Sequence, residues 1–518
     1  MAVVLGSAIV FLDSTVVNVA LPAMGQQLPV SLFGVLEAQS YVVNGYLLAL
    51  SALLILAGAL ADVYGRRRLF IIGLIGFGIS SVLCGLSTSM EMLIVFRLVQ
   101  GAFGALLVPA SLAIITATFE GADRGRAFGI WAAASSATTV LGPPLGGLLV
   151  DSIGWPVAFL INVPLVAIAL YFAATAVSES RDEDASGRFD WAGALVVAVA
   201  VGGLTYGAIR GQEQQWVDRS AWIALALGAV ATVALVPLMV WRRHPLVPPS
   251  LFTSRNFTIT NISTFLIYGA LYVFAYIQGI FMQGTLGYTA MAAGLAGIPI
   301  NVLIATLSTT VGRLAGRVGP RLFMAVGPTL MALGLLWLVR IPGDSAAWRA
   351  DPGDPASLLP PISYLVDVFP AVLIFGVGIA MLVAPLTTAL MSSVPVRNSG
   401  LASAINNAIS RVGPLLAGAV IFVAVTASFY GSLQARLPEL DTDAPAVRAE
   451  VAPLNRPSEE LSADEAQAAR AASTDAFHLA MLIAALLCAA GAAVNALGIR
   501  NPDLSQVDAA REQVATST

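Results

Sequence analysis

The sequence has 518 residues, of which 58% are hydrophobic and only 11% are charged, and its mean hydropathy is +0.84. Soluble domains carry about a quarter charged residues, so this chain needs lipid around much of its surface. The net charge of −4 gives no basic surface for nucleic acid. All 26 basic residues are arginine, which argues against the lysine-dependent phosphate loop of ATP-driven pumps and against Schiff-base chemistry.

The sequence gives no indication of a cofactor or a metal site. Its two cysteines, Cys84 and Cys488, lie within apolar runs and are typical of buried small side chains, so no disulfide is indicated. Its two histidines, His244 and His478, are far apart and lack the spacing of metal ligands. We therefore expect neither a cofactor nor a metal.

About fourteen apolar segments have the length of a membrane-spanning helix, which is roughly 20 residues. The first segment has no basic n-region, and Asp13 interrupts its apolar core, so we expect a retained helix rather than a cleaved signal peptide. The spans are expected near residues 2–23, 40–61, 69–88, 92–118, 127–150, 155–177, 191–209, 221–241, 257–282, 291–311, 321–340, 363–391, 399–427 and 475–498.

The orientation of the spans follows from their arginines, because short loops rich in arginine stay on the cytoplasmic side of a membrane. The loop between the second and third spans contains Arg66, Arg67 and Arg68. Placing this loop in the cytoplasm also places most of the other loop arginines there. The sequence therefore predicts a multi-pass protein of the cytoplasmic membrane with both termini in the cytoplasm.

An internal repeat predicts two related halves. Gly-x-Leu-Ala-Asp-x-x-Gly at 58–65 recurs as Gly-x-Leu-Ala-Gly-x-x-Gly at 312–319, and the glycines and proline of 129–147 recur at the same spacings in 400–418. Parallel repeats of this kind are typical of transporters. We expect an all-α integral membrane fold of two pseudo-symmetric six-helix bundles with two inserted linker helices. The expected division is an N-terminal bundle at 1–178, linker helices at 179–255, a C-terminal bundle at 256–500 with an extracytoplasmic loop at 428–474, and a cytoplasmic tail at 501–518.

Charged groups within the spans are candidates for the transport mechanism. Asp13 lies in the first span and Arg97 in the fourth, and the opposite directions of these spans place the two residues at similar depth. A carboxyl group in a membrane is costly unless it is neutral or paired, so Asp13 is suited to loading and releasing a proton. Gln100 lies one turn from Arg97 and is expected to share its network. A purely structural ion pair is the alternative.

Three sequence motifs lie at the ends of spans or within them: GALADVYGRRR at 58–68, RLVQGAFGA at 97–105 and LGPPLGG at 141–147. They resemble the loop 2–3 motif, the fourth-helix motif and the fifth-helix antiporter motif of the major facilitator superfamily. LDSTVVNVALP at 12–22 and WPVAFLINVP at 155–164 are similar to segments of the fourteen-helix drug:proton antiporters. The chain is therefore identified as resembling that branch.

This resemblance implies proton-driven export of an amphipathic small molecule by alternating access, with the proton gradient as the energy source and with lipid as the surroundings. It assigns proton coupling to Asp13, Arg97 and Gln100. It assigns an inner gate to Asp62, Gly65, Arg66 and Arg67, and a contact between the bundles to Gly142, Pro143, Gly146 and Gly147. Val63 departs from the family, which often has a basic residue there, so one salt bridge of the gate is in doubt.

The repeat refines the expectation for Asp62. Its counterpart in the second half is Gly316, so the carboxylate belongs to one half only. We expect Asp62 to bind the positive N-terminal end of the thirteenth span, near Asn398 and Ser399. Gating is thus assigned to Asp62 and proton carriage to Asp13.

Polar and aromatic residues within the spans are candidates for a substrate cavity. Tyr268, Tyr272 and Tyr276 recur one turn apart, although such a stripe is also typical of packing within a bundle. The tenth span contains no acid, so an amphipathic or weakly charged substrate fits better than a dication. The full candidate set is Asn18, Glu37, Tyr268, Tyr272, Tyr276, Asn301, Asn407 and Arg411.

Other functions remain open at this point. An exporter of lipids or of one specific metabolite would use the same fold, whereas an importer is disfavoured by LGPPLGG. A membrane enzyme would need clustered His, Cys or acidic residues, and a sensor would not need Asp13, Arg97 and Asp62. The acidic, Pro- and Ala-rich loop at 428–474 is expected to be solvated, with a partner-docking surface as the alternative. One chain can enclose a transport pathway, so a monomer is expected.

Overall fold

The computed structural model describes residues 1–29, 35–181, 189–213, 217–242, 245–351, 353–442, 444, 447, 451, 453–455 and 461–501. The regular structure of these residues is helical apart from one isolated β-bridge. The helices are α1 (Ala2–Gln27), α2 (Val35–Tyr64), α3 (Arg66–Gly85), α4 (Met90–Thr118), α5 (Gly121–Ile153), α6 (Val157–Leu160), α7 (Asn162–Ala176), α8 (Trp191–Glu213), α9 (Arg219–Trp241), α10 (Ser250–Thr253), α11 (Arg255–Gly284), α12 (Ala290–Val318), α13 (Arg321–Leu338), α14 (Phe369–Ser392), α15 (Ser399–Arg436) and α17 (Ala463–Gly498).

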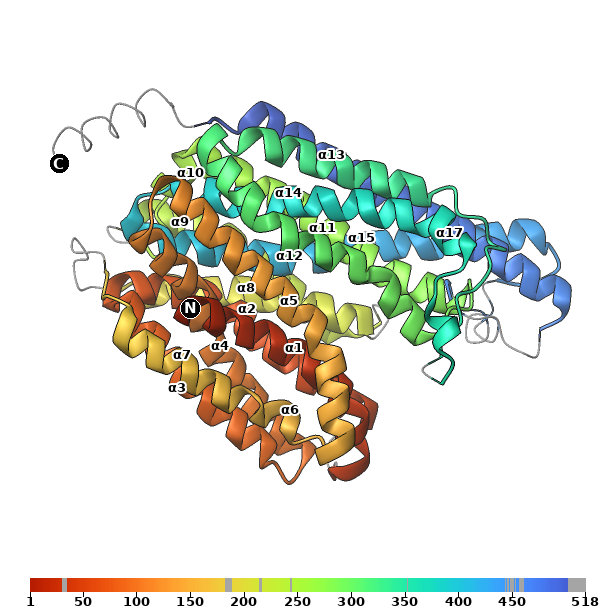
Figure 1. Cartoon of the computed structure of the whole chain (residues 1–518), viewed down its shortest axis with the longest axis horizontal. Coiled ribbons are helices and arrows are strands. Elements are labelled where there is room, and N and C mark those ends of the chain that lie inside the picture. Colours follow the sequence, from red (N-terminus) through yellow and green to blue (C-terminus); the bar gives the residue numbers. More distant parts are fainter. Residues whose placement is uncertain are drawn as a thin grey trace.

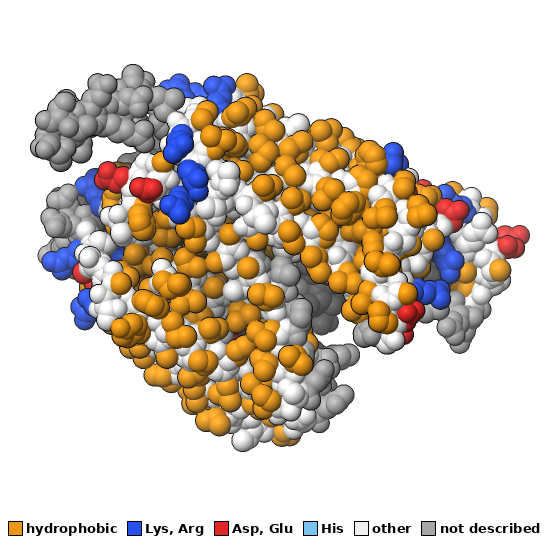
Figure 2. Space-filling model, in the orientation of Figure 1, with side chains coloured by type: hydrophobic (Ala, Val, Ile, Leu, Met, Phe, Trp, Pro, Cys, Tyr) orange, Lys and Arg blue, Asp and Glu red, His pale blue; other side chains and the backbone are white. Residues whose placement is uncertain are grey.

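The lengths of these helices confirm the predicted membrane fold. Within the described residues, thirteen helical segments are long and apolar enough to span a membrane, with α6 and α7 forming one of them. The 33-residue helix α5, rich in small residues, completes the set of about fourteen. Hydrophobic side chains cover the sides of the molecule, and charged side chains gather toward its two ends (Figure 2). This distribution matches a molecule that crosses a bilayer along its helices.

One expected boundary differs from the structure. The loop predicted at 428–474 is shorter, because α15 continues to Arg436 and α17 already begins at Ala463. Ser462 and Glu465 form a capping box at the start of α17, in which each side chain binds the backbone N–H of the other residue. These caps stabilise helical turns beyond the apolar segment, which hydropathy alone could not locate.

Two bundles and a linker hairpin make up the molecule (Figure 1). Helices α1 to α7 form the N-terminal bundle, and α11 to α15 together with α17 form the C-terminal bundle. The hairpin α8–α9 packs against α2. The bundles meet where α2 packs against α15 and where α5 packs against α12, which are equivalent pairs in the repeat.

We call the end of the molecule that holds Met1, Gly65 and Asn501 the terminal end, and the opposite end the distal end. Figure 1 shows the bundles side by side at the terminal end and diverging toward the distal end. A buried apolar cluster crosses between the bundles near the terminal end, where Leu54 and Phe128 join Leu390 and Ile405.

Glycines allow the closest contacts between the bundles. A Cβ atom on Gly58 would lie 2.4 Å from the carbonyl oxygen of Gly400, and one on Gly125 would lie 2.4 Å from that of Gly312. Both contacts lie in the terminal halves of the helices. In the distal half of α12, by contrast, a Cβ atom on Gly294 would meet no atom of the described residues within 4 Å. The structure is therefore closed at the terminal end and open at the distal end.

Enlarging Gly58 is expected to open the terminal end. In Gly58→Val the new side chain collides with α15, and overpacking of this kind costs about 1–3 kcal/mol. The distance between spin labels on the exposed positions Ile72 and Leu322 of a cysteine-free variant should increase. The matched control is Gly294→Val, where the added atoms meet open space. An unchanged distance in Gly58→Val would show that this contact does not hold the bundles together.

Candidate functional site

A buried polar network surrounds Asp13 in the N-terminal bundle. The Asp13 side chain is 0% exposed, and its Oδ2 lies 2.6 Å from Nη1 of Arg97. Its Oδ1 accepts hydrogen bonds from Gln100 Nε2 at 3.1 Å and from Asn162 Nδ2 at 2.8 Å. Ser81 Oγ accepts from Gln100 at 2.7 Å and lies 3.3 Å from Asn162 Nδ2. The carboxylate is therefore held by residues of α4 and α7.

The guanidinium of Arg97 has partners on several sides. Its Nε donates to the backbone oxygen of Val42 at 3.1 Å, and its Nη1 donates to Gln100 Oε1 at 2.7 Å. The ring centre of Tyr46 lies 4.0 Å from its Cζ, within the range of a cation–π contact. Arg97 is only 1% exposed, so these groups and Asp13 replace the water that its charge would otherwise need.

Helix geometry explains how the sequence builds this network. Arg97 and Gln100 are three residues apart on α4 and therefore share one of its faces. The break between α6 and α7 at Ile161 places Asn162 in the first turn of α7. Asp13 lies eleven residues into α1, which is about 17 Å along its axis. The network thus lies near the middle of the spans.

The structure brings together the three residues that were expected to act in coupling, and it adds three that were not assigned. Ser81, Asn162 and Tyr46 complete the surroundings of Asp13 and Arg97. Asn162 lies in WPVAFLINVP, so the sequence did mark its segment, although not its contact. Ser81 and Tyr46 lie in no sequence motif that would have pointed to the network.

The second site joins the two bundles at the terminal end. Asp62 Oδ1 lies 2.9 Å from Arg66 Nη2, and both side chains are buried. The same carboxylate accepts hydrogen bonds from the backbone N–H groups of Gly400 at 3.0 Å and Leu401 at 2.8 Å. Arg66 Nη2 also donates to the backbone oxygen of Val396. The Asp62 carboxylate of α2 therefore caps the first turn of α15, which begins at Ser399. The positive N-terminal end of a helix favours such an acid.

The other two residues assigned to the gate lie within the N-terminal bundle instead. Gly65 has a φ of 110°, which favours glycine, and a Cβ atom there would meet the carboxylate of Glu179. Arg67 Nε donates to the backbone oxygen of Ala173 at 3.1 Å, and its backbone N–H donates to Glu179. These contacts attach α3 to the end of α7 and to the segment that follows it, within the N-terminal bundle. The assignment of Gly65 and Arg67 to the gate stays a prediction.

The fifth-helix motif contains two glycines in close contact with a neighbouring helix. A Cβ atom on Gly142 would lie 1.9 Å from Thr15 Oγ1, and one on Gly146 would lie 2.9 Å from a methyl carbon of Val16. These glycines therefore face α1 of their own bundle. The close contact of α5 with the other bundle is made nearer its start, at Gly125.

Two further members of that motif, Pro143 and Gly147, lie in α5, but their surroundings are outside the described part of the structure. The nearest neighbours of Gly142 and Gly146 thus lie on α1, and the assignment of this motif to the contact between bundles stays a prediction. A small residue marks a close helix approach without specifying the partner helix, and in this structure the partner of both glycines is α1.

The candidate cavity residues of the N-terminal bundle give little evidence for a binding wall. Asn18 is exposed on α1, and its Nδ2 donates to the backbone oxygen of Ser14 at 2.9 Å. Glu37 lies in α2, but its side chain is outside the described residues.

The tyrosines of α11 do not form one uniform surface. Tyr272 and Tyr276 are 54% and 58% exposed, whereas Tyr268 packs against the core of the C-terminal bundle. Tyr276 also packs edge-to-face on Phe422 of α15, with ring centres 5.1 Å apart. Packing between helices therefore accounts for part of this stripe.

Three further candidates of the C-terminal bundle are half-buried polar residues. Asn301 Nδ2 lies 3.4 Å from the backbone oxygen of Gly297, and Asn407 Nδ2 donates to that of Ser403 at 2.9 Å. Both amides thus satisfy a donor within their own helices. Arg411 of α15 differs from them because it carries a full charge.

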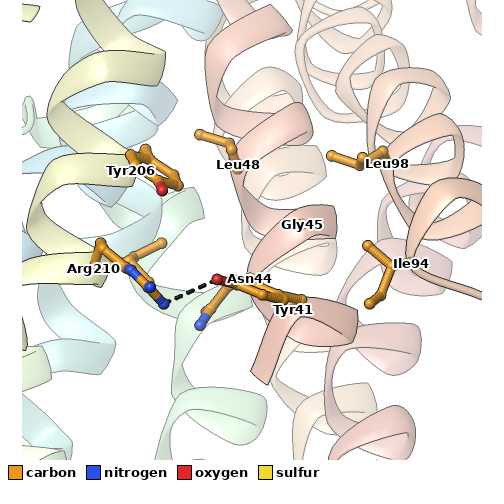
Figure 3. Close-up of a pocket in the computed structure, with 9 residues that line it drawn as sticks. Tyr41, Asn44, Gly45, Leu48, Ile94, Leu98, Tyr206 and Arg210 are labelled. Carbon is orange, nitrogen blue, oxygen red and sulfur yellow. Dashed lines mark hydrogen bonds between the residues drawn. The ribbon is translucent and has the colours of Figure 1, made fainter. Parts of the chain in front are cut away.

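A lateral pocket that the sequence did not predict lies between α2, α4 and α8 (Figure 3). Its volume is about 170 Å³, and most of its lining is apolar. Arg210 extends from α8 and donates to Tyr41 Oη at 2.9 Å. Arg210 also binds Asp218 at 2.8 Å, and the backbone N–H of Ser220 together with Arg210 lowers the pKa of Asp218. These bonds fasten the linker hairpin to α2.

Comparisons with known proteins agree with this architecture. The Major Facilitator Superfamily matches residues 3–418. The chain is 33% identical over 434 residues to the multidrug resistance protein Stp of Mycobacterium tuberculosis, covering 84% of this chain and 76% of that protein. It is 31% identical over 428 residues to the tetracenomycin C resistance and export protein of Streptomyces glaucescens, covering 82% and 74%. The crystal structure of the human organic anion transporter MFSD10 has a similar fold, with a TM-score of 0.58 at 14% identity and coverage of 94% and 98%.

The helical spans, the two bundles and their repeat define a multi-pass membrane transporter rather than an enzyme. The chain belongs to the major facilitator superfamily.

Proposed function

We propose that this transporter exports amphipathic drugs or antibiotics from the cytoplasm in exchange for protons. The observation that carries proton coupling is Asp13, a fully buried carboxylate near the middle of the spans. Such a group is costly in a membrane and is typical of proton routes. Export of drugs is supported by the relatives, one a multidrug resistance protein and another a resistance and export protein.

The proposed orientation places the terminal end in the cytoplasm. Arg66, Arg67 and Arg68 lie there, as do Arg317 and Arg321 of the second half. The positive-inside rule then puts both termini in the cytoplasm and the protein in the cell membrane. The structure would accordingly represent a state that is closed to the cytoplasm and open to the outside.

A route of packed side chains could link the proton site to the bundle contacts. Protonation of Asp13 removes its attraction to Arg97, which loosens α1 against α4. The next turn of α1, at Thr15 and Val16, packs directly on the glycines of α5. A displacement of α1 would therefore reach α5, whose first turns contact α12. We propose this route as the link between proton binding and alternating access.

Reconstitution of the purified chain tests the proposed function. Proteoliposomes containing the pH dye pyranine and an imposed pH gradient are given drugs from a compound panel. A drug that is a substrate should release protons across the membrane, and nigericin should abolish its transport. A rate of drug transport that does not depend on the pH gradient would contradict proton coupling. Movement of fluorescent phospholipid without movement of any drug would favour the alternative, a lipid exporter. A single chain encloses the route, so activity is expected from the monomer.

A further inference from the structure

Arg411 is a charge in a part of the C-terminal bundle that is poor in acidic residues. It lies twelve residues into α15, about 18 Å from the start of that helix, close to the depth of Asp13 in α1. None of the helices α11, α12, α13, α14 and α15 contains an Asp or a Glu. The acids of α17, the sixth helix of this bundle, lie in its distal part, where Asp475 binds Arg436. Helices α11 to α15 therefore offer the guanidinium of Arg411 no carboxylate.

Two buried arginines of the N-terminal bundle are each paired with an acid. Arg66 and Arg97 are each about 1% exposed, and each is bound to a carboxylate. Arg411 is half-buried, and among the described residues it has neither a hydrogen bond nor an ion pair. A cation at this depth needs water or an anion to compensate its charge.

The position of Arg411 on its helix directs it toward the N-terminal bundle. Gly400 and Ala404 both lie against Gly58 of α2. Arg411 follows them by eleven and seven residues, which returns it to the same face of α15. Helix α15 packs against α2 and α4, which carry Tyr46, Arg97 and Gln100 of the Asp13 network. Arg411 therefore lies on the face of α15 that is turned toward the N-terminal bundle.

We propose that Arg411 binds the anionic group of an amphipathic substrate in the space between the bundles. A planar guanidinium matches a carboxylate or sulfonate with two parallel hydrogen bonds. The absence of acids from α11 to α15 disfavours cationic substrates on this side of the space. This inference rests on the proposed export function and adds the charge of the preferred substrate to it.

A series of three probes with one fluorophore tests the inference. Dansylglycine carries a carboxylate, its methyl ester is neutral, and dansylcadaverine is a cation. Uptake of each into proteoliposomes is measured with an imposed pH gradient. The wild-type chain should have a KM for dansylglycine at least about tenfold below that for the ester, since charge-assisted bonds are the stronger ones.

Variants at Arg411 identify the residue responsible. Arg411→Gln should raise the KM for dansylglycine at least about tenfold, with a far smaller change for the ester, and Arg411→Lys should restore part of the preference because the charge is retained. The matched control is Arg340→Gln, which removes an exposed charge at the distal end of α13.

Two results would overturn the inference and leave the export function standing. One is proton-driven transport of the ester or the cation with no preference for dansylglycine. The other is a preference for dansylglycine that survives in Arg411→Gln. Failure of the wild-type chain to move any of the three probes would instead count against the proposed function and the inference together.

Discussion

Asp13→Asn is expected to reduce proton-driven drug exchange in proteoliposomes to the level of empty vesicles. Asparagine retains the shape of the side chain and can still accept hydrogen bonds from Gln100 and Asn162. It cannot bind or release a proton in the physiological range, so an imposed pH gradient should no longer drive transport. The measurement is drug uptake with and without the gradient, together with release of protons on addition of drug.

Two controls separate coupling from folding. Gln27→Ala alters an exposed amide on the same helix, outside every candidate site, and should leave coupling unchanged. Asp13→Asn leaves the buried Arg97 without an anion, and breaking a buried pair in this way typically costs about 3–5 kcal/mol. The double variant Asp13→Asn/Arg97→Gln removes both charges and should recover thermal stability but not coupling. Gradient-driven transport in Asp13→Asn would remove this residue from the proton route.

Asp62→Asn should impair transport at least about tenfold without changing the number of protons exchanged per drug. The carboxylate accepts two backbone hydrogen bonds from α15 and pairs with Arg66. Hydrogen bonds to charged groups contribute about 1.5–3 kcal/mol each. Their loss should shift the molecule away from the state that is closed at the terminal end.

The shift is measured by the spin-label distance between Ile72 and Leu322, which should increase in Asp62→Asn. The matched control is Asp123→Asn, an exposed acid at the same end of the molecule in the first turn of α5. A changed proton-to-drug ratio in Asp62→Asn would refute the division of roles, because the residue would then take part in coupling as well as gating.

Hydropathy and charge predicted the spans because a bilayer imposes a length on each helix and a cost on each buried charge. The pairing of Asp13 with Arg97 followed from their equal depth in helices of opposite direction. The contact of Asp62 with the start of α15 followed from helix electrostatics and from the repeat. In these cases the depth of a charged residue in its helix, or the partial charge at a helix end, is enough to predict the contact.

Rotation of the helices about their axes and the separation of the bundles could not be predicted in the same way. Asn162 reaches Asp13 only because of the break at Ile161, which sequence periodicity does not locate. Gly142 and Gly146 of LGPPLGG indicate a close helix approach, but the sequence does not say that α1 is the helix that approaches them. Which helices touch depends on the conformation as well as on the sequence.

The burial of the Asp13–Arg97 pair has a consequence for how the protein is made. The two residues are 84 positions apart, so α1 leaves the ribosome well before α4. During membrane insertion Asp13 must enter lipid without its partner, at a cost of about 2.5–3.5 kcal/mol for a charged residue at the centre of a helix. The Val, Ile, Leu and Phe residues of α1 each contribute about 0.3–0.6 kcal/mol in the opposite direction. The apolar content of α1 therefore has to compensate for its acid until α4 is synthesised.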